Sequence, residues 1–583
     1  MSIPNDLSAE SDAVGRIAPP VALPEVPSPF LADPPRVQLL REESAAHPFA
    51  TTVAAAWSCY GARPASVGNV RRLVYGPEPA GANPVKAADR EVRRERAIRL
   101  YSDLFAAGHH TTFQHATFVF VLDNVSRLAI WSFFHSHPNY NSEQVSQRYR
   151  EVTGDTVGVP DLPAAERAVY EAAVRRSLDG YRRLTELLTP DMASRYGQVF
   201  PSRVRATGPE AERRVADAVQ KRAQEVARYV LPLAAPAHLY HTVNGLTLLR
   251  YAVLAGQPDA PSEVRWIVRE MLAQVLEVDP YFLGGPGHPL DLRPAGFAES
   301  AEGQALAAWQ ANAAQGAAES EAFCREFDAA LGPWRQSRLA GYNPDAERTL
   351  AAAARAVLGK TEAALPDAEA IGLVLDGRRN PTLGHALYLG MHDKLLQTMN
   401  HVPFTFRKRL SGAEDAQNQR HRTTLSSSPV LAAHLRREPD VIVPWALRGN
   451  PAALAEYEAT IGAMWAAKNR LQDAGVEAET LLRLLPNAHR VRFFESGTLL
   501  GYYWKWVKRL CFDAQREIFE TALEEVAQVR EVLPLIGAHV DGPPCVMRSR
   551  SGARPICPEG ERYCGVPVWR GHRFEDLEGR RVM

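Results

Sequence analysis

Apolar and polar side chains alternate along one segment in the first quarter of the chain. From Gln114 to Leu122 the apolar positions recur with a period of two, which predicts a half-buried strand. Segments with a helical period surround it, among them 164–188 and 263–278. A mixture of such strands and amphipathic helices favours an α+β fold.

The strand pattern belongs to a set of landmarks that occurs twice. In each copy a His precedes two Phe by three and five residues, and a His-containing triplet follows. These residues are His115, Phe118, Phe120 and 134–136 in one copy, and His401, Phe404, Phe406 and 420–422 in the other. A Leu-Pro pair comes later in both, at 231–232 and 485–486, before a helix that opens with Glu. Shared landmarks in the same order indicate a tandem duplication.

Composition divides the chain into five parts. The first residues are rich in Pro, Ala and Ser, which predicts a disordered tail. Gly and Pro punctuate residues 284–300, as at a boundary, and an Ala-rich helical stretch follows. The predicted parts are the tail at 1–48, a first unit at 49–283, a linker and helical segment at 284–368, a second and more diverged unit at 369–537, and an extension at 538–583.

The charge balance argues against nucleic acid as a partner. Lys and Arg together number 67, as do Asp and Glu, whereas proteins that bind a phosphate backbone usually carry a basic excess. Asp123 and Arg127 interrupt the longest apolar run, 117–134, so no membrane partner is expected. The first residues lack a secretory pattern, which favours the cytoplasm.

Six cysteines are too few for a disulfide scaffold in a chain of this length. Three of them, Cys545, Cys557 and Cys564, fall close together near the end of the sequence. With His539 or His572 they form a candidate Cys₃His set for zinc. They contain no Cys-x-x-Cys pair, so ordinary thiols on a surface extension are the alternative.

Taken together, the landmarks resemble the flavin-dependent thymidylate synthases. That family has, in order, a His-rich turn, a strand with alternating Phe, Arg-His-Arg, Ser-x-Arg-Tyr, Arg-x-Val-Leu-Pro, Thr-Val-Asn and Ala-Gln-x-Glu-Ile. The resemblance covers roughly 49–282 and, more weakly, 370–530. It implies two synthase-like units in tandem, each an antiparallel sheet with flanking helices.

The first copy matches several family motifs. GHHTTFQHATFVF and HTVN imply flavin contacts, while SEQVSQRY and ARYVLP imply contacts with the nucleotide. The implied flavin residues are His109, Thr111 and Asn244, and the implied nucleotide residues are Ser146, Arg148 and Arg228. This copy departs from the family at the triplet, which reads Phe-His-Ser. Trp131 stands in place of a nucleotide-binding Gln, and Ala255 in place of the arginine that polarises uracil.

The second copy matches the family in the opposite places. QNQRHR implies a nucleotide contact at Gln417 and flavin contacts at Arg420, His421 and Arg422. Arg509 falls on the uracil-polarising arginine, which makes it the implied catalytic residue, and AQREI follows it. The departures are Leu395 at the flavin histidine, Val430 at the nucleotide serine, Leu482 at the Leu-Pro arginine and Thr498 at the asparagine.

The resemblance implies reductive methylation of dUMP to dTMP. The methylene group would come from methylenetetrahydrofolate, the hydride from reduced FAD, and the reducing equivalents from NADPH. Because the retained sets are complementary, we expect one hybrid site between the copies, in a homodimer that resembles the family's tetramer.

Two other functions remain open from the sequence. One is a catalytically silent homologue that keeps nucleotide or flavin binding for a structural or regulatory role, since neither copy has a full site. The other is a flavoenzyme that acts on a different pyrimidine. The arginines singled out above also have purely structural interpretations. Helical arginines often form surface ion pairs, and an Arg-His-Arg triplet alone is typical of a solvated basic run.

Overall fold

The structure, a computed structural model, describes residues 18–76, 84–152, 157–293 and 296–583. It has an α+β fold with two four-stranded sheets, as predicted. The first sheet has the strand order β1-β2-β4-β3, and the second has the order β7-β8-β10-β9. If the strands of the first copy are matched to those of the second in chain order, the two sheets have the same topology.

The chain forms two compact units, and each contains one of the sheets. Unit 1 comprises residues up to Val125, Asn139–Gln144 and Pro236–Ser300, and unit 2 comprises Ser126–Pro138, Val145–Ala235 and Ala301–Met583. Much of the predicted first unit at 49–283 therefore belongs to unit 2. The sequence does not reveal that helices of the first copy pack in unit 2, because hydrophobic periodicity predicts elements and not the core into which each one packs.

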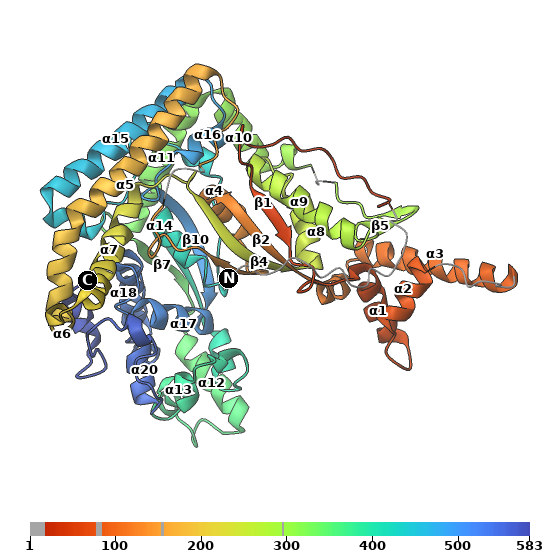
Figure 1. Cartoon of the computed structure of the whole chain (residues 1–583). Coiled ribbons are helices and arrows are strands. Elements are labelled where there is room, and N and C mark those ends of the chain that lie inside the picture. Colours follow the sequence, from red (N-terminus) through yellow and green to blue (C-terminus); the bar gives the residue numbers. More distant parts are fainter. Residues whose placement is uncertain (1–17, 77–83, 153–156, 294–295) are drawn as a thin grey trace. The chain divides into compact units, whose positions relative to one another are not determined.

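Unit 1 contains the first four-stranded sheet, a separate two-stranded sheet and several helices (Figure 1). Its strands are β1 (Arg36–Leu39), β2 (Thr117–Ser126), β3 (Asn141–Gln144), β4 (Pro236–Asn244), β5 (Gly284–Gly285) and β6 (His288–Pro289). Its helices are α1 (Pro48–Tyr60), α2 (Val67–Tyr75), α3 (Pro84–Ala106), the 3₁₀ helix η1 (His110–His115), α8 (Gly245–Leu254) and α9 (Ser262–Val278). Phe118, Phe120 and Leu122 of β2 are all buried, which confirms the alternation seen in the sequence.

Strand β1 lies inside the segment for which the sequence predicts a disordered tail. It pairs antiparallel with β2, with Arg36 opposite Asp123 and Leu39 opposite Phe120. Four residues are too short a run to stand out among prolines, and an edge strand of this length depends on its neighbour for stability. The remainder of the predicted tail, residues 1–17, lies outside the described residues.

Unit 2 holds the second sheet and the longest helices. Its strands are β7 (Ser337–Tyr342), β8 (Pro403–Ser411), β9 (Thr424–Ser426) and β10 (Arg490–Thr498). Its helices are α4 (Arg127–Ala129), α5 (Ala164–Val199), α6 (Pro201–Arg205), α7 (Pro209–Ala227), α10 (Ala301–Ala311), α11 (Ala313–Leu331), α12 (Ala346–Leu358), α13 (Asp367–Leu375), α14 (Gly412–Asn418), α15 (Pro451–Asp473), α16 (Ala478–Arg483), α17 (Leu499–Arg509), α18 (Arg516–Val532), α19 (Pro534–Gly537), α20 (Pro544–Arg550) and α21 (Leu577–Arg580). Strand β7 and helix α12 fall in the range predicted as a linker and helical segment.

Helices α5 and α15, which come from different copies, pack side by side in unit 2 (Figure 1). Gly180 of α5 faces Thr460 of α15 so closely that an added Cβ would overlap the threonine side chain. Tyr181 and Tyr457, from the same two helices, are buried in one apolar cluster. Burial of this shared face stabilises the association of the two copies.

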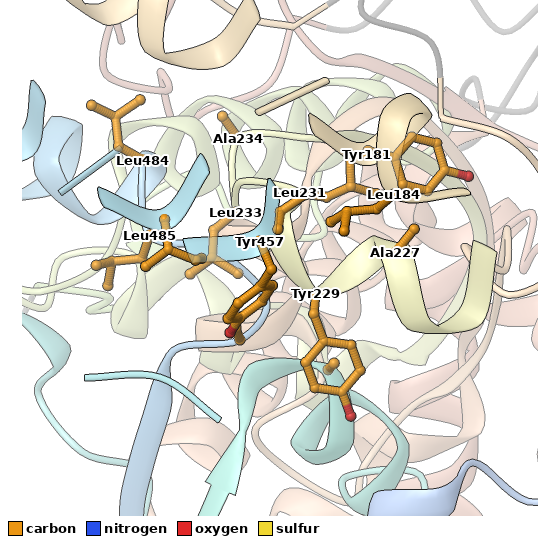
Figure 2. Close-up of a cluster of buried hydrophobic side chains, with 14 of the residues drawn as sticks. Tyr181, Leu184, Ala227, Tyr229, Leu231, Leu233, Ala234, Tyr457, Leu484 and Leu485 are labelled. Carbon is orange, nitrogen blue, oxygen red and sulfur yellow. The ribbon is translucent and has the colours of Figure 1, made fainter. Parts of the chain in front are cut away.

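The two Leu-Pro pairs of the repeat lie against each other in the same cluster. Leu233 N donates to Leu485 O, and Asn487 N donates to Leu231 O, each at 2.8 Å. Pro232 and Pro486 form an antiparallel bridge. Figure 2 shows Leu231 and Leu233 beside Leu485. The contact is reciprocal, because equivalent residues exchange equivalent bonds, as at an isologous interface.

In the sequence, the landmarks from His115 to residue 136 and from His401 to residue 422 have the same spacing, which predicts an alignment without gaps. The structure shows a gap in the alignment of the two copies. Ser126 and Ser411 are equivalent N-caps that accept from Ala129 N and Glu414 N, and they lie 285 positions apart. The preceding histidines of the repeat, His115 and His401, lie 286 apart. Asn124, inside β2, has a φ of 57°, a left-handed conformation that asparagine tolerates. The first copy therefore has one extra residue before its cap.

Candidate functional site

Gln515 connects residues of both copies. It immediately precedes α18, and its Oε1 accepts hydrogen bonds from Arg228 Nη2 and from Gln417 Nε2. Its Nε2 donates to the hydroxyl of Tyr229, which in turn donates to Glu517. The two lone pairs of an amide oxygen match the two donors. The structure thus brings Arg228 of the first copy and Gln417 of the second to one side chain.

A second link between the copies is formed by Arg148. Its Nη2 donates to the backbone carbonyl of Asp513 at 2.8 Å and to Glu225 Oε2 at 3.0 Å. The Arg148 side chain is only 13% exposed. Ser146 Oγ accepts from the backbone N of Arg148 at 3.2 Å, which holds the local turn. Arg222 reinforces the arrangement by donating to Asp513 Oδ1 at 2.9 Å.

Arg509, at the end of α17, is held by two residues of the second copy. Its Nε donates to His421 Nε2 at 2.8 Å, and its Nη2 donates to the carbonyl of Gln417 at 2.7 Å. Burial, together with the charges of Arg509 and Lys505, holds the pKa of His421 well below its usual value. His421 is therefore neutral at pH 7 and accepts through Nε2.

Several arginines around these residues are destabilised in their charged form. Burial and the charges of Arg148 and Arg420 lower the pKa of Arg509 to about 9. Burial and the charges of Arg228 and Arg420 lower the pKa of Arg127 to about 9 as well. Like charges at close range repel, so the charged forms of Arg509 and Arg127 are less favourable than in water. All of these groups remain protonated at neutral pH.

Two arginines of the triplet differ from the histidine between them. Arg420 and Arg422 are exposed, and His421 is half-buried. The charge of Arg420 acts on its surroundings, since it contributes to the low pKa of His135, about 3, after burial.

The three remaining predicted residues belong to unit 1. His109 and Thr111, at the start of η1, are exposed. Asn244 is the N-cap of α8, and its Oδ1 accepts from Thr247 N at 2.9 Å. Its amide group is half-buried and keeps two N–H donors.

The departures of the first copy have structural consequences in unit 2. Trp131 Nε1 donates to Asp415 Oδ2 at 2.7 Å, and its carbonyl accepts from Gln419 Nε2 at 3.2 Å. Leu482, equivalent to Arg228 in the repeat, packs against the apolar cluster. Trp131 and Leu482 thus carry apolar groups, or groups already hydrogen-bonded within the protein, where the other copy of the repeat carries an amide or a guanidinium donor.

Sequence reasoning missed several residues of this cluster. Gln515 and Tyr229 lie within the motifs AQREI and ARYVLP, so the motifs could have indicated them. Within these two motifs, the sequence predicts a function only for Arg228. Glu225, Asp513 and Arg127 gave no comparable signal. The bonds of Asp513 join residues hundreds of positions apart, which a single sequence does not show.

The three cysteines of the extension share one small cavity with Cys511. The cavity has a volume of about 10 Å³. Burial raises the pKa of each thiol, that of Cys511 to about 12. His572 does not line this cavity and bonds instead to the carbonyl of Asp541 at 2.8 Å. In the part of the chain that is described, no three His, Cys, Asp or Glu side chains are arranged to hold a metal ion.

None of the helices in the described ranges is both long and apolar enough to cross a membrane. The longest apolar run of the sequence, 117–134, folds as β2 followed by α4 and a π-helical turn, Ile130–Phe134.

Comparison with known proteins places the chain in a family. The model of the family "Thymidylate synthase complementing protein" matches residues 42–281 and 338–535. A flavin-dependent thymidylate synthase of Clostridium tetani is 24% identical over 217 residues, which cover 37% of this chain and 78% of the relative. One of Geobacter sulfurreducens is 27% identical over 191 residues, covering 32% and 68%.

A solved structure is also similar over part of the chain. It is the UMP/dUMP methylase PolB from Streptomyces cacaoi bound with 5-Br dUMP, at 17% identity and a TM-score of 0.27, covering 44% of this chain and 99% of that one. The family model matches both copies of the repeat, and together the two matches span most of the chain. The chain therefore belongs to the thymidylate synthase complementing protein family, with two units of that family in tandem.

Proposed function

We propose that the protein methylates dUMP reductively to dTMP, with FAD as cofactor and with methylenetetrahydrofolate and NADPH as co-substrates. The observation that supports this most is the meeting of Arg148 and Arg228 with Gln417, Gln515 and Arg509. These residues come from both copies and form one polar cluster. The relatives from Clostridium tetani and Geobacter sulfurreducens are flavin-dependent thymidylate synthases, which supports this proposal.

The cluster has the chemistry that a nucleotide monophosphate requires. A phosphate dianion binds well to guanidinium groups, which offer paired N–H donors in a fixed plane. In the proposed site Arg148 and Arg228 bind the phosphate, and Ser146 and Gln417 add hydroxyl and amide groups. The Nε atoms of Arg148 and Arg228 are buried and have no hydrogen-bond partner among the described residues. These donors remain available when the side chains shift toward a ligand.

Arg509 acts on the uracil ring in this proposal. A fixed positive group stabilises negative charge on N3 and C4, and so makes the adjacent carbon nucleophilic. His421 and the carbonyl of Gln417 occupy two of the donors of Arg509, which orients its guanidinium. Because His421 is neutral, it fixes this orientation without adding a competing charge.

The residues implied for the flavin have suitable chemistry. In unit 2, the exposed guanidinium groups of Arg420 and Arg422 suit phosphates. In unit 1, His109, Thr111 and Asn244 offer polar groups that suit a flavin's pyrimidine edge. Asn244 retains its amide donors while its oxygen caps α8. When bound, the flavin supplies the hydride for the reduction. The chain's own residues hold the uracil and its phosphate in position.

The hybrid site explains why each copy lost different residues. The expected hybrid needs the Ser-x-Arg-Tyr segment of the first copy close to the Arg-His-Arg region of the second. Within unit 2, the charge of Arg148 contributes to the low pKa of Arg509, so the two groups lie near each other. A homodimer of such chains would hold as many units as the family's tetramer, and we propose this assembly.

Zinc binding at Cys545, Cys557 and Cys564 stays a prediction from the sequence. The shared cavity adds Cys511 as a fourth thiol, but the side chains do not stand at ligand positions. Elemental analysis of the purified protein tests this directly. About one zinc per chain, lost in a Cys545→Ser, Cys564→Ser double variant, would support the site, and metal-free protein would contradict it.

The proposed activity is tested by incubating the chain with dUMP, methylenetetrahydrofolate, FAD and NADPH. We expect dTMP by mass spectrometry, and we expect Arg228→Leu to abolish it, since this variant installs the residue found at the equivalent position of the second copy. Arg183→Leu, an exposed position on α5, is the matched control. Nucleotide binding without turnover would favour a catalytically silent homologue. Methylation of another pyrimidine would favour a flavoenzyme with a different substrate.

A further inference from the structure

The loop between α17 and α18 carries two residues, Asp513 and Gln515, that hold the proposed nucleotide site. Asp513 O accepts from Arg148, and Gln515 Oε1 accepts from Arg228 and Gln417. Ala514 lies between them and takes no part in these bonds. Because the loop supplies both a carbonyl and a side chain, a small shift of its backbone moves several nucleotide-binding groups together.

Arg581, in the C-terminal extension, binds this loop at Ala514. Its Nη2 donates to Ala514 O at 2.6 Å, and its guanidinium carbon lies 4.6 Å from the ring centroid of Phe519 on α18. Arg581 is only 7% exposed. It also lines a cavity of about 70 Å³ together with Gln515 and Tyr229. Arg581 thus contacts the loop and shares a cavity wall with its most connected side chain.

The extension itself is anchored on α18 and on α5. Leu577 is fully buried in the apolar cluster that includes Phe519. Arg195 Nη1, on α5, donates to Val582 O at 3.0 Å, and Arg581 Nε donates to Met583 O at 2.5 Å. Arg581 is therefore fixed from both sides along the chain. A donor that is itself fixed can restrict the motion of the loop carbonyl, whereas a mobile donor would move together with the loop.

The family match ends at residue 535, so the extension is a feature of this chain beyond the matched region. We propose that Arg581 is a positioning residue for the nucleotide site: it holds the Cys511–Gln515 loop so that Asp513 and Gln515 orient Arg148 and Arg228. This inference rests on the proposed function for its catalytic consequence. The holding of the loop itself is independent of any substrate.

The test compares Arg581→Ala and Arg581→Lys with Arg580→Ala. Arg580 is the matched control, because its guanidinium bonds, among the described residues, to the carbonyls of Val568 and Pro567 inside the extension. Amide hydrogen exchange over 511–516 and dUMP affinity by calorimetry are measured on folded protein. We expect Arg581→Ala to speed exchange in the loop at least tenfold and to weaken dUMP binding about tenfold, with Arg581→Lys between it and the wild type.

Arg580→Ala should leave both loop exchange and dUMP affinity unchanged, even if it lowers the melting temperature. Equal loop exchange in Arg581→Ala and Arg580→Ala would overturn the inference. Faster exchange with unchanged dUMP affinity would overturn the link to the nucleotide site. If the wild type does not bind dUMP, the proposed function fails, and hydrogen exchange alone decides whether Arg581 holds the loop. If Arg581→Ala does not fold, Arg581→Lys provides the same comparison.

Discussion

The guanidinium of Arg148 donates a hydrogen bond to the backbone carbonyl of Asp513 at 2.8 Å, although 365 positions of sequence separate the two residues. Arg148 belongs to the first copy of the repeat and Asp513 to the second. The carbonyl lies four residues after Arg509, which the family resemblance marks as catalytic. A group proposed to bind the nucleotide in one copy is thus fixed by the loop that follows the proposed catalytic group of the other.

This arrangement makes the hybrid site testable by a double-mutant cycle. Arg148→Ala and Arg509→Ala should each weaken dUMP binding by about 1.5–3 kcal/mol, because each removes a charge-assisted contact. If both arginines act on one bound nucleotide, the double variant should show a coupling energy of at least about 0.5 kcal/mol in calorimetry. Additive losses, or no loss from either variant, would leave two independent relics in place of one site.

Gln515 should matter for binding although it carries no charge. Gln515→Ala removes the acceptor shared by Arg228 and Gln417 and leaves both without that partner. A hydrogen bond contributes about 0.5–1.5 kcal/mol net, so we expect dUMP affinity to fall about five- to tenfold. Gln220→Ala, at an exposed position on α7, is the control and should bind dUMP like the wild type. Equal affinity of the two variants would remove Gln515 from the site.

Flavin binding is expected to depend on His109. Purified protein, or protein mixed with FAD, should absorb at roughly 450 nm, as bound oxidised flavins do. His109→Ala should weaken FAD binding in a calorimetric titration, whereas His115→Ala, another exposed histidine of the same turn, should not. Colourless protein that gives no heat with FAD would exclude the flavoenzyme interpretation altogether.

Buried histidines should make the protein sensitive to acid. Burial lowers the pKa of His135 to about 3 and that of His489 to about 4, from an ordinary 6.5. Below pH 6.5 the unfolded chain takes up these protons and the folded chain does not, so stability is lost as the pH falls from about 6.5 to about 4. A shift of this size corresponds to about 3 kcal/mol per histidine at the acid end.

The measurement is the free energy of unfolding in urea at pH 7, 6, 5 and 4. The slope of this free energy with pH should decrease in His489→Gln, because one proton fewer is taken up on unfolding. His115→Gln changes an exposed side chain and should leave the slope as it is. A slope that is the same in both variants would mean that His489 titrates normally in the folded protein.

The sequence by itself determined the elements, the repeat and the family. Alternation at Phe118 and Phe120, helical periods and ordered landmarks are local properties, set by side-chain direction along a strand or helix. They predicted an α+β fold with two related units. The sequence also indicated the chemical type of the proposed site residues, because the guanidinium and amide groups in the motifs are suited to bind a nucleotide.

Only the tertiary structure decided which residues meet. The placement of first-copy helices in unit 2, the reciprocal contact of the two Leu-Pro pairs and the bonds of Gln515 all depend on packing between distant segments. The bond from Arg581 to Ala514 has the same origin. Burial of a shared apolar face selects these contacts, and the free energy of that burial depends on surfaces that form only when the whole chain has folded.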